Sequence, residues 1–353
     1  ALAGIATKAT GDNNLSITVN DLELDAAALN ALDAKTNTAV VITAAQKITG
    51  SAADLAKIYD ANKNNFTDEG AEEVVVTGTT VAAADINSIN AGNSGAKKIS
   101  STVSTITGSA ADIKTALTNA NAAGGTVGAG TKFDAAAQAV LRATNATVTG
   151  TTATAEDLND IRTFTQNTTT GVITNGGLTT GTITLSSDFE TLSGAATEVL
   201  SALDSSEPPT FNSITSPVLI NGLQGKKLDI SSGASLAVIN TITDTYNVGQ
   251  IEATLTDVNA NAVIAKFLPT SSVDGLKRVG DKININLSDK TAIAAADLIA
   301  LDARTTGTIT LVHNNGGAPD PNVPSLAGSA ADLATVMGSA GVAGKADALI
   351  DVT

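Results

Sequence analysis

One stretch decides the fold: Ile48-Thr49-Gly50-Ser51-Ala52-Ala53-Asp54-Leu55. It returns as residues 106–113 (ITGSAADI) and again as residues 326–333 (LAGSAADL), and weaker copies follow Gly150 and Gly194. Self-similarity of this kind is the signature of repeat architectures, in which each unit is one supersecondary element. The sequence therefore predicts a tandem array instead of a domain built around one unique core.

A second motif recurs between the copies of the first. Residues 29–36 (LNALDAKT) match residues 298–305 (LIALDART) almost letter for letter. Gly50 and Gly108 are separated by 108 − 50 = 58 residues, and each span of this length reads as two related halves. We therefore take one half as the structural unit.

Each half begins with β-branched residues, which suit pleated strands. The clearest of these runs are Ile17–Val19, Val74–Val76, Thr182–Leu185 and Ile283–Leu287. A turn of Thr, Ser, Gly or Asp follows, and then an Ala-rich stretch with apolar residues three or four apart, which is typical of a short helix. Each half is therefore predicted to be a strand followed by a helix.

The repeated Ser and Asp are predicted to cap these helices. The Ser51 hydroxyl can accept the amide of Asp54, whose carboxylate lies in the first turn, where the helix dipole favours it. Leu55 and Ile58 then share one face, and the helix is expected to end at Asp60-Ala61-Asn62. The same reading assigns capping roles to the residues Ser51, Asp54, Ser109, Asp112, Ser329 and Asp332.

The predicted fold is an α/β repeat: an elongated solenoid of strand-plus-short-helix units with a largely parallel sheet. An antiparallel or mixed sheet stays open as an alternative, because short loops such as Thr305-Thr306-Gly307 also permit it. We expect residues 1–205 to form one repeat array and residues 276–353 to resume it, ending in a C-terminal strand. The motif is lost over residues 206–275, where prolines appear, so this segment is expected to be a β-rich irregular insert or a set of degenerate repeats.

The composition excludes several classes of function. The chain has 353 residues with 20 Lys+Arg against 35 Asp+Glu, and a net charge of −15 gives no basic footprint for nucleic acid. It has no Cys, and no apolar run approaches the ~18–20 residues of a membrane span. Aromatic residues make up only 2%, which indicates thin layers of small aliphatic side chains. The first residue is Ala1, which we interpret as the result of signal-peptide removal, with excision from a longer protein as the alternative.

The alternation of TGSAADL (residues 49–55) with LNALDAKT (residues 29–36) resembles the Thr/Ala/Asp-rich tandem repeats of very large cell-surface proteins in marine cyanobacteria and related bacteria. The composition, acidic and rich in Thr, Ala, Gly and Asn, resembles that of S-layer proteins. The resemblance covers roughly residues 10–205 and 276–353. It implies an extracellular location at the cell surface and a structural role.

Calcium is the one cofactor for which the sequence offers candidate ligands. The resemblance implies calcium-binding nonapeptides of the G-G-x-G-x-D type, but this sequence has none, and residues 316–320 are the nearest approach. Loops rich in Asp and Asn are the weaker candidates for metal ligands, namely Asp12, Asn13, Asn14, Asp320 and Asn322.

Catalysis is not expected. His313 is the only histidine, and there is no Cys to pair with it. Paired carboxylates are the groups that glycoside chemistry requires, but the chain has no Trp to form a sugar platform. The repeated Asp residues recur because helix starts favour them. The candidate pairs are Asp68-Glu69, Glu72-Glu73, Glu156-Asp157 and Asp188 with Glu190.

The two ends of the array are predicted to join copies of the chain. The C-terminal segment resembles the first strand of a further repeat, with Leu349, Ile350 and Val352 as assembly residues, and residues 1–6 are apolar. Open solenoid ends expose unpaired edges. We therefore expect a non-enzymatic structural subunit of an S-layer, sheath or filament that self-associates head to tail. The alternative is an adhesin stalk or a carbohydrate-binding surface module with cell-surface polysaccharide as its partner.

Overall fold

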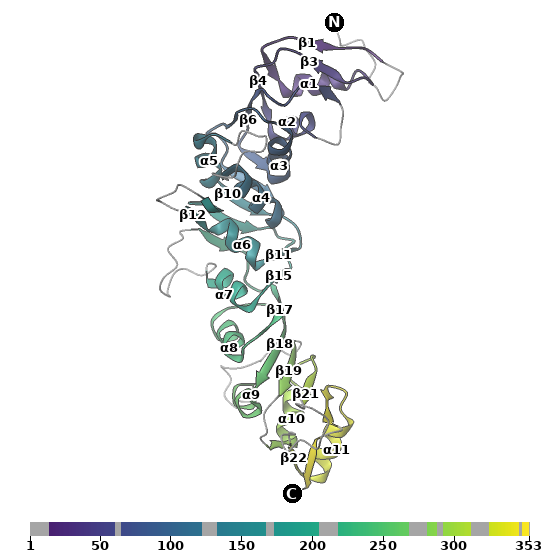
Figure 1. The fold of residues 1–353 in the computed structure, drawn as a ribbon. Helices are drawn as coiled ribbons and strands as arrows, with labels where there is room; N and C mark the ends of the chain where they lie inside the picture. Colours follow the sequence, from purple (N-terminus) through teal and green to yellow (C-terminus); the bar gives the residue numbers. More distant parts are fainter. Residues whose placement is uncertain are drawn as a thin grey trace. The chain divides into compact units, whose positions relative to one another are not determined.

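Strands and helices alternate along the whole of the chain that the structure describes (Figure 1). The structure is a computed structural model and describes residues 14–60, 65–121, 133–166, 173–204, 218–267, 281–287, 292–311, 325–345 and 348–352. The helices are short: α1 (Ala26–Asp33), α2 (Ala52–Ile58), α3 (Ala83–Gly92), α4 (Ala110–Asn121), α5 (Ala135–Arg142), α6 (Ala155–Arg162), α7 (Ala196–Asp204), α8 (Leu236–Thr245), α9 (Ala260–Phe267), α10 (Ala295–Asp302) and α11 (Ala330–Gly338).

The strands form several sheets in which neighbours are parallel. One is three-stranded: β1 (Thr18–Val19), β3 (Val40–Ile42) and β5 (Phe66–Thr67). A four-stranded sheet follows: β2 (Glu23–Asp25), β4 (Lys47–Ser51), β6 (Glu73–Thr77) and β8 (Lys97–Ile99). The five-stranded sheet contains β16 (Leu219–Asn221), β14 (Thr182–Leu185), β10 (Asn145–Val148), β9 (Thr105–Gly108) and β7 (Thr80–Ala82).

The remaining strands complete the set. The seven-stranded sheet contains β11 (Thr152–Thr154), β15 (Thr191–Ser193), β17 (Lys227–Ala234), β18 (Ile251–Val258), β19 (Lys282–Leu287), β21 (Ile309–Leu311) and β23 (Val342–Ala343). A second three-stranded sheet contains β20 (Ile293–Ala294), β22 (Ser325–Gly328) and β24 (Leu349–Val352). Only β12 (Phe164–Gln166) and β13 (Ile173–Gly176) pair in antiparallel fashion among the described strands.

The α/β class, the parallel pairing and the predicted strands are confirmed. The runs predicted from β-branched residues form β1, β6, β14 and β19. The helix predicted after Ser51 is α2, which ends at Ile58. The strands do not continue in a single sheet, however. The strand that leads into the helix belongs to the four-stranded sheet before α1 and α2, to the five-stranded sheet before α3 and α4, to the seven-stranded sheet before α6 to α9, and to a three-stranded sheet before α10 and α11.

Contacts divide the chain into two compact units. One comprises residues 1–150, 157–188 and 209–221, and the other comprises residues 151–156, 189–208 and 222–353. In the first, helices α1 to α4 pack in succession against one another. In the second, α7, α8 and α9 lie in a row beside β15, β17 and β18 (Figure 1).

The parallel sheets contribute rows of buried, mostly aliphatic side chains, which we call core columns. In the five-stranded sheet one column runs across all the strands, because the register places each of these residues opposite the next. Its members are fully buried: Val81, Ile106, Ala146, Ile183 and Ile220. A column takes one small or medium-sized aliphatic side chain from each strand, so the core needs few aromatic rings.

The glycine of the repeated motif is required by close packing between successive units. A Cβ added to Gly50 would lie 2.5 Å from the Cβ of Ala26, the first residue of the preceding helix. The same contact recurs at 3.1 Å between Gly108 and Ala83, and at 3.2 Å between Gly328 and Ala295. Real Cβ atoms do not approach as closely as the Gly50 contact, so the motif needs glycine there.

The threonine of the second motif also joins successive units. Thr36 is fully buried, and its hydroxyl donates to the carbonyl of Leu15 at 2.6 Å. The matching Thr305 hydroxyl lies near the carbonyls of Asp281 (3.1 Å) and Ile283 (2.9 Å). Buried hydroxyls need such partners, which explains why the motif ends in Thr.

The segment 206–275 contains regular helices that the sequence interpretation missed. Its described residues form the strands β16 to β18, in line with the β-rich structure expected there, but also the helices α8 and α9. Ser235 caps α8 through the amide of Val238, and Ile239 and Ile242 are buried three residues apart. The helical spacing was therefore present in the sequence, although the TGSAAD motif was not. The predicted division at 205 and 275 stays a prediction.

Candidate functional site

The predicted capping residues lie at helix starts and are hydrogen-bonded to each other. Ser51 Oγ accepts the amide of Asp54 at 3.1 Å and donates to its carboxylate at 2.7 Å. The same pair of bonds joins Ser109 to Asp112 and Ser329 to Asp332. The hydroxyl hydrogen bond is the main cause that lowers the pKa of Asp54. The charged form of Asp54 is thus favoured at the N-terminus of α2, where the helix dipole also stabilises negative charge.

The same aspartates also receive a donor from the preceding helix, a contact that the sequence interpretation did not predict. Asn30 donates to the carbonyl of Asp54 at 3.0 Å, and Asn87 donates to the carbonyl of Asp112 at 3.1 Å. In each case the donor is the fifth residue of its helix and the acceptor the third residue of the next. The spacing of 24 or 25 residues between an Asn and an Asp was the available signal.

Helix α10 provides a natural test of the cap. It begins with the same Ala-Ala-Asp as α2, but its N-cap is Ala294, which makes no side-chain cap bond. The backbone of Ala294 is extended, as at Ser51. We expect Ala294→Ser to raise the free energy of unfolding by about 1 kcal/mol, measured by urea unfolding followed by circular dichroism. Ala296→Ser, within the same helix, should give no gain; equal effects at both positions would contradict the capping argument.

Two of the four candidate carboxylates at residues 68–73 are engaged in local structure: Glu73 pairs with Lys98 at 2.7 Å, and Glu72 stabilises a turn. Glu72 is buried and accepts the hydroxyl of Tyr59 at 2.5 Å and the amides of Gly70 and Ala71 at 2.8 and 2.9 Å. Burial, and secondarily the charge of Glu72, raise the pKa of Glu69. A cavity of about 440 Å³ lies beside this turn, lined by residues 42–46, 68, 71 and 72.

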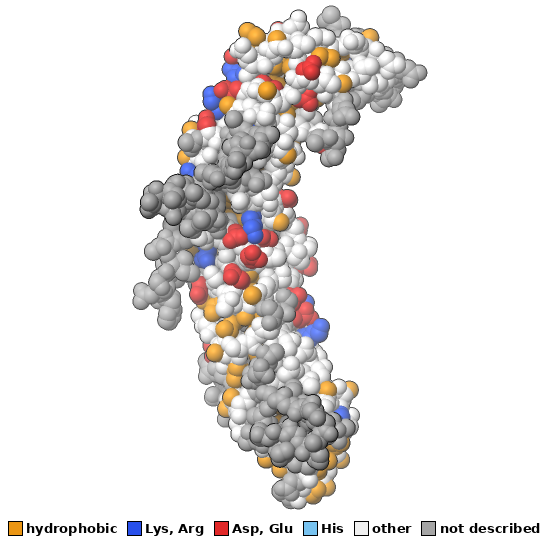
Figure 2. Space-filling model, viewed as in Figure 1, with side chains coloured by type: hydrophobic (Ala, Val, Ile, Leu, Met, Phe, Trp, Pro, Cys, Tyr) orange, Lys and Arg blue, Asp and Glu red, His pale blue; other side chains and the backbone are white. Residues whose placement is uncertain are grey.

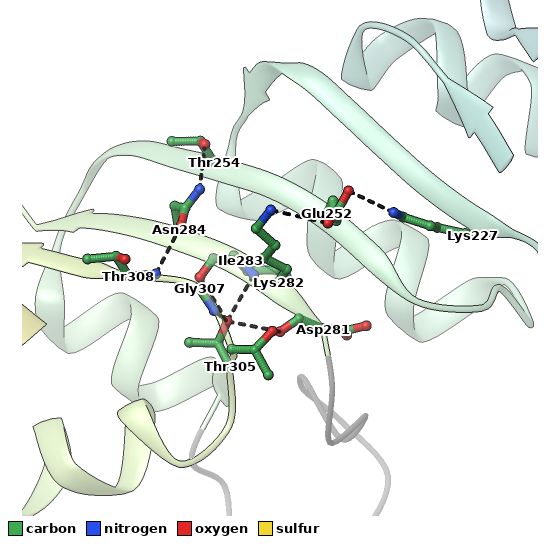
Figure 3. A network of polar contacts seen from close by, with 11 residues as sticks. Lys227, Glu252, Thr254, Asp281, Lys282, Ile283, Asn284, Thr305, Gly307 and Thr308 are labelled. Atoms are coloured by element: carbon green, nitrogen blue, oxygen red, sulfur yellow. Dashed lines mark hydrogen bonds and ion pairs between the residues drawn. The ribbon is translucent and has the colours of Figure 1, made fainter. Parts of the chain in front are cut away.

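Charged side chains on the sheets alternate in sign. On the seven-stranded sheet, Glu252 lies between Lys227 (2.8 Å) and Lys282 (3.4 Å), and we call these three residues the ion ladder (Figure 3). On the four-stranded sheet, Lys47 pairs with Glu23 at 2.8 Å. Figure 2 shows the same tendency on the face in view, where basic side chains lie beside acidic ones in small mixed clusters. Among the described side chains on this face, Figure 2 shows no large single-sign patch that would attract a polyanion or polycation.

The ion ladder predicts a modest, salt-dependent contribution to stability. We expect Glu252→Gln to lower the free energy of unfolding by less than about 1 kcal/mol, with the difference shrinking at high salt. Hydrogen bonds from Lys227 and then Lys282 hold the pKa of Glu252 below its usual value. A lowered folded pKa means that this contribution is present at neutral pH and lost as pH falls from about 4.3 through the folded value.

Urea unfolding of both proteins across this pH range measures the effect. Glu190→Gln is the matched control, because Glu190 is exposed and forms no ion pair with the described residues. Equal salt dependence of the two variants would show that the ladder contributes nothing.

The core is uncovered at one sheet end. In the second three-stranded sheet, one column runs from Ile293 through Leu326 to Ile350. Leu326 is 0% exposed, whereas Ile350 is 50% exposed and Val352 is 65% exposed. β24 pairs with β22, and no other described strand lies along its second edge. The predicted assembly residues Ile350 and Val352 therefore lie on an exposed apolar edge, and Leu349 belongs to the same strand.

Four of the five calcium candidates, Asp12, Asn13, Asp320 and Asn322, lie outside the described residues, as does His313. Asn14 is described and exposed. Within the described ranges no group of three or more His, Asp or Glu side chains is arranged to hold a metal ion. Among the described helices, none is long and apolar enough to cross a membrane.

Comparison with known proteins gives no relative for this chain: no family model, curated protein or solved structure matches it.

Proposed function

We propose that the chain is a structural subunit of an extracellular surface assembly, such as an S-layer, a sheath or a filament, and that it acts by self-association. In this proposal the strand–helix units stack into one elongated solenoid. Each unit covers the apolar face of its neighbour, so that the ends of the stack require a partner. The resemblance of the repeats to those of bacterial surface proteins supports the location.

The observation on which the proposal depends is the exposed end of the core column at β24. A soluble protein usually protects an edge strand with charge, proline or a covering element. β24 instead presents Ile350 and Val352, at alternate positions of a strand whose second edge is unpaired among the described residues. An exposed edge with apolar side chains is suited to accept a further strand.

Charge on this edge should prevent assembly. We expect Val352→Lys to abolish polymers while leaving the circular dichroism spectrum unchanged, because a lysine on an edge strand opposes strand addition. Leu219→Lys is the matched control, since Leu219 is a half-exposed apolar residue on another edge strand, β16. Sedimentation velocity and electron microscopy, with and without a calcium chelator, measure the result.

The results of this experiment distinguish a self-assembling subunit from an adhesin stalk or a carbohydrate-binding module. Ordered polymers that Val352→Lys abolishes and Leu219→Lys leaves intact support the proposal. Polymers that Val352→Lys leaves unchanged contradict it. Separate particles at every concentration would favour the adhesin stalk or carbohydrate-binding module instead.

A further inference from the structure

We propose that the outer face of the five-stranded sheet is a binding surface for ice, formed by a regular array of threonine and asparagine side chains. The inference goes beyond self-association and does not depend on it, because all five strands belong to one compact unit and none of them is β24.

The outer face consists of the residues that alternate with the core column. Successive side chains of a strand point to opposite faces, so the neighbours of each buried column residue point away from the core. These neighbours are exposed or half-exposed, whereas the column is buried. Apart from Ala82 and Leu219, they all carry a hydroxyl or an amide, and we call them the threonine face: Thr80, Thr105, Thr107, Asn145, Thr147, Thr182, Thr184 and Asn221.

The strand register places one row of these side chains before the core column. Thr80 lies opposite Thr105, and Thr105 lies opposite Asn145. Thr182 continues the row, since its hydroxyl donates to Asn145 Oδ1 at 3.2 Å. Four adjacent strands therefore contribute one uncharged polar side chain each.

A second row lies beyond the column. Thr107 is opposite Thr147, Thr147 is opposite Thr184, and Thr184 is opposite Asn221. The hydroxyls of Thr107, Thr147 and Thr184 have no hydrogen-bond partner among the residues that the structure describes. They are therefore available to a ligand.

The two rows form a lattice with two characteristic spacings. Adjacent strands lie ~4.8 Å apart, and side chains two residues apart along a strand are separated by ~6.6 Å. The shorter spacing is close to the shortest repeat of oxygen positions in hexagonal ice, and the longer one approaches the next repeat. Because a β-branched side chain has few χ1 rotamers, the hydroxyl and methyl groups are ordered before binding.

Order matters for this ligand because ice has the same chemistry as the liquid around it. A hydroxyl that exchanges a bond to liquid water for a bond to ice gains almost no free energy by itself. Only a surface that fits many lattice positions at once distinguishes the crystal from the liquid. Pre-ordering of such a surface also lowers the entropic cost of binding.

The absence of charge separates the threonine face from the other sheets. The chain carries 20 Lys+Arg and 35 Asp+Glu, yet none of them lies in the two rows. The four-stranded sheet instead bears the pair of Glu23 with Lys47, and the seven-stranded sheet bears the ion ladder. Threonine alone would be explained by its preference for strands. The exclusion of charge is the added observation that points to an uncharged, periodic partner, since a charged side chain would hold its own hydration water in place of the ice lattice.

Ice shaping and thermal hysteresis test the inference. The purified chain is cooled around a single ice crystal, and the crystal shape and the gap between its melting and freezing temperatures are measured. Thr147→Lys lies in the middle of the second row, and Thr184→Lys lies on the next strand. The matched control is Thr49→Lys, because Thr49 is also half-buried but lies opposite Asp25 on the four-stranded sheet. Circular dichroism checks that each variant is folded.

We expect the wild-type chain and Thr49→Lys to shape ice, and both variants of the threonine face to lose thermal hysteresis at least several-fold. A wild-type chain that neither shapes ice nor shows thermal hysteresis would overturn the inference, as would a Thr147→Lys variant as active as the wild type. Co-sedimentation with crystalline cellulose provides a further measurement. Binding to cellulose that Thr147→Lys abolishes, without any effect on ice, would show that the face takes a crystalline polysaccharide and that ice is the wrong ligand.

Discussion

Leu326→Ala should lower the free energy of unfolding by about 2–5 kcal/mol, the range for large-to-small changes in a packed core. Leu326 is fully buried in the column that joins β20, β22 and β24, so truncation leaves a cavity between flanking strands. Ile350→Ala, the next position of the same column, should change stability by no more than about 0.5 kcal/mol, because half of that side chain already faces solvent.

The pair is informative because the two changes are chemically alike and lie on adjacent strands. Urea unfolding at low protein concentration, followed by circular dichroism, measures the unassembled chain. A loss at Ile350 as large as that at Leu326 would mean that the column does not end uncovered at β24, and the proposed assembly edge would lose its basis.

Gly50→Ala should cost about 1–3 kcal/mol although it adds only one methyl group. Gly50 does not require the left-handed backbone region, so its cost is steric: the new Cβ would meet the Cβ of Ala26 at 2.5 Å. Gly338→Ala is the control. A Cβ there meets nothing within 4 Å, and the substitution should stabilise the chain by about 0.4–1 kcal/mol through the unfolded state.

A double substitution identifies the contact. In the Gly50→Ala background, Ala26→Gly should restore part of the lost stability, since it removes the opposing methyl group. Additive losses would show that the strain arises elsewhere and that the motif keeps glycine for another reason.

Much of the fold could be predicted from the sequence because strand formation and helix capping depend on residues that are close together in the chain. The β-branched runs identified β6, β14 and β19, and Ser51 with Asp54 identified the start of α2. The division into several sheets could not be predicted in this way, because it depends on which of two extended segments in a unit pairs with the next unit. Helix α8 was missed because its cap, Ser235, lies outside the motif, although Ile239 and Ile242 carried the helical spacing.

The candidate site was only partly accessible from the sequence. Ile350 and Val352 could be named as assembly residues because their strand resembles those that precede helices. Their exposure could not be predicted, because it depends on whether another element covers the edge. The contacts of Asn30 with Asp54 and of Thr36 with Leu15 also depend on three-dimensional stacking, since each joins residues more than 20 positions apart.

The core columns have a consequence for how the native chain opens. Each column gains its protection from neighbours on both sides, so amide protons of interior strands such as β9 and β10 should exchange with deuterium far more slowly than those of β24. Fraying would begin at Ile350 and move inward one strand at a time. A strand added at this edge would slow exchange there first, which would make the terminal amides a sensitive reporter of the moment when two copies meet.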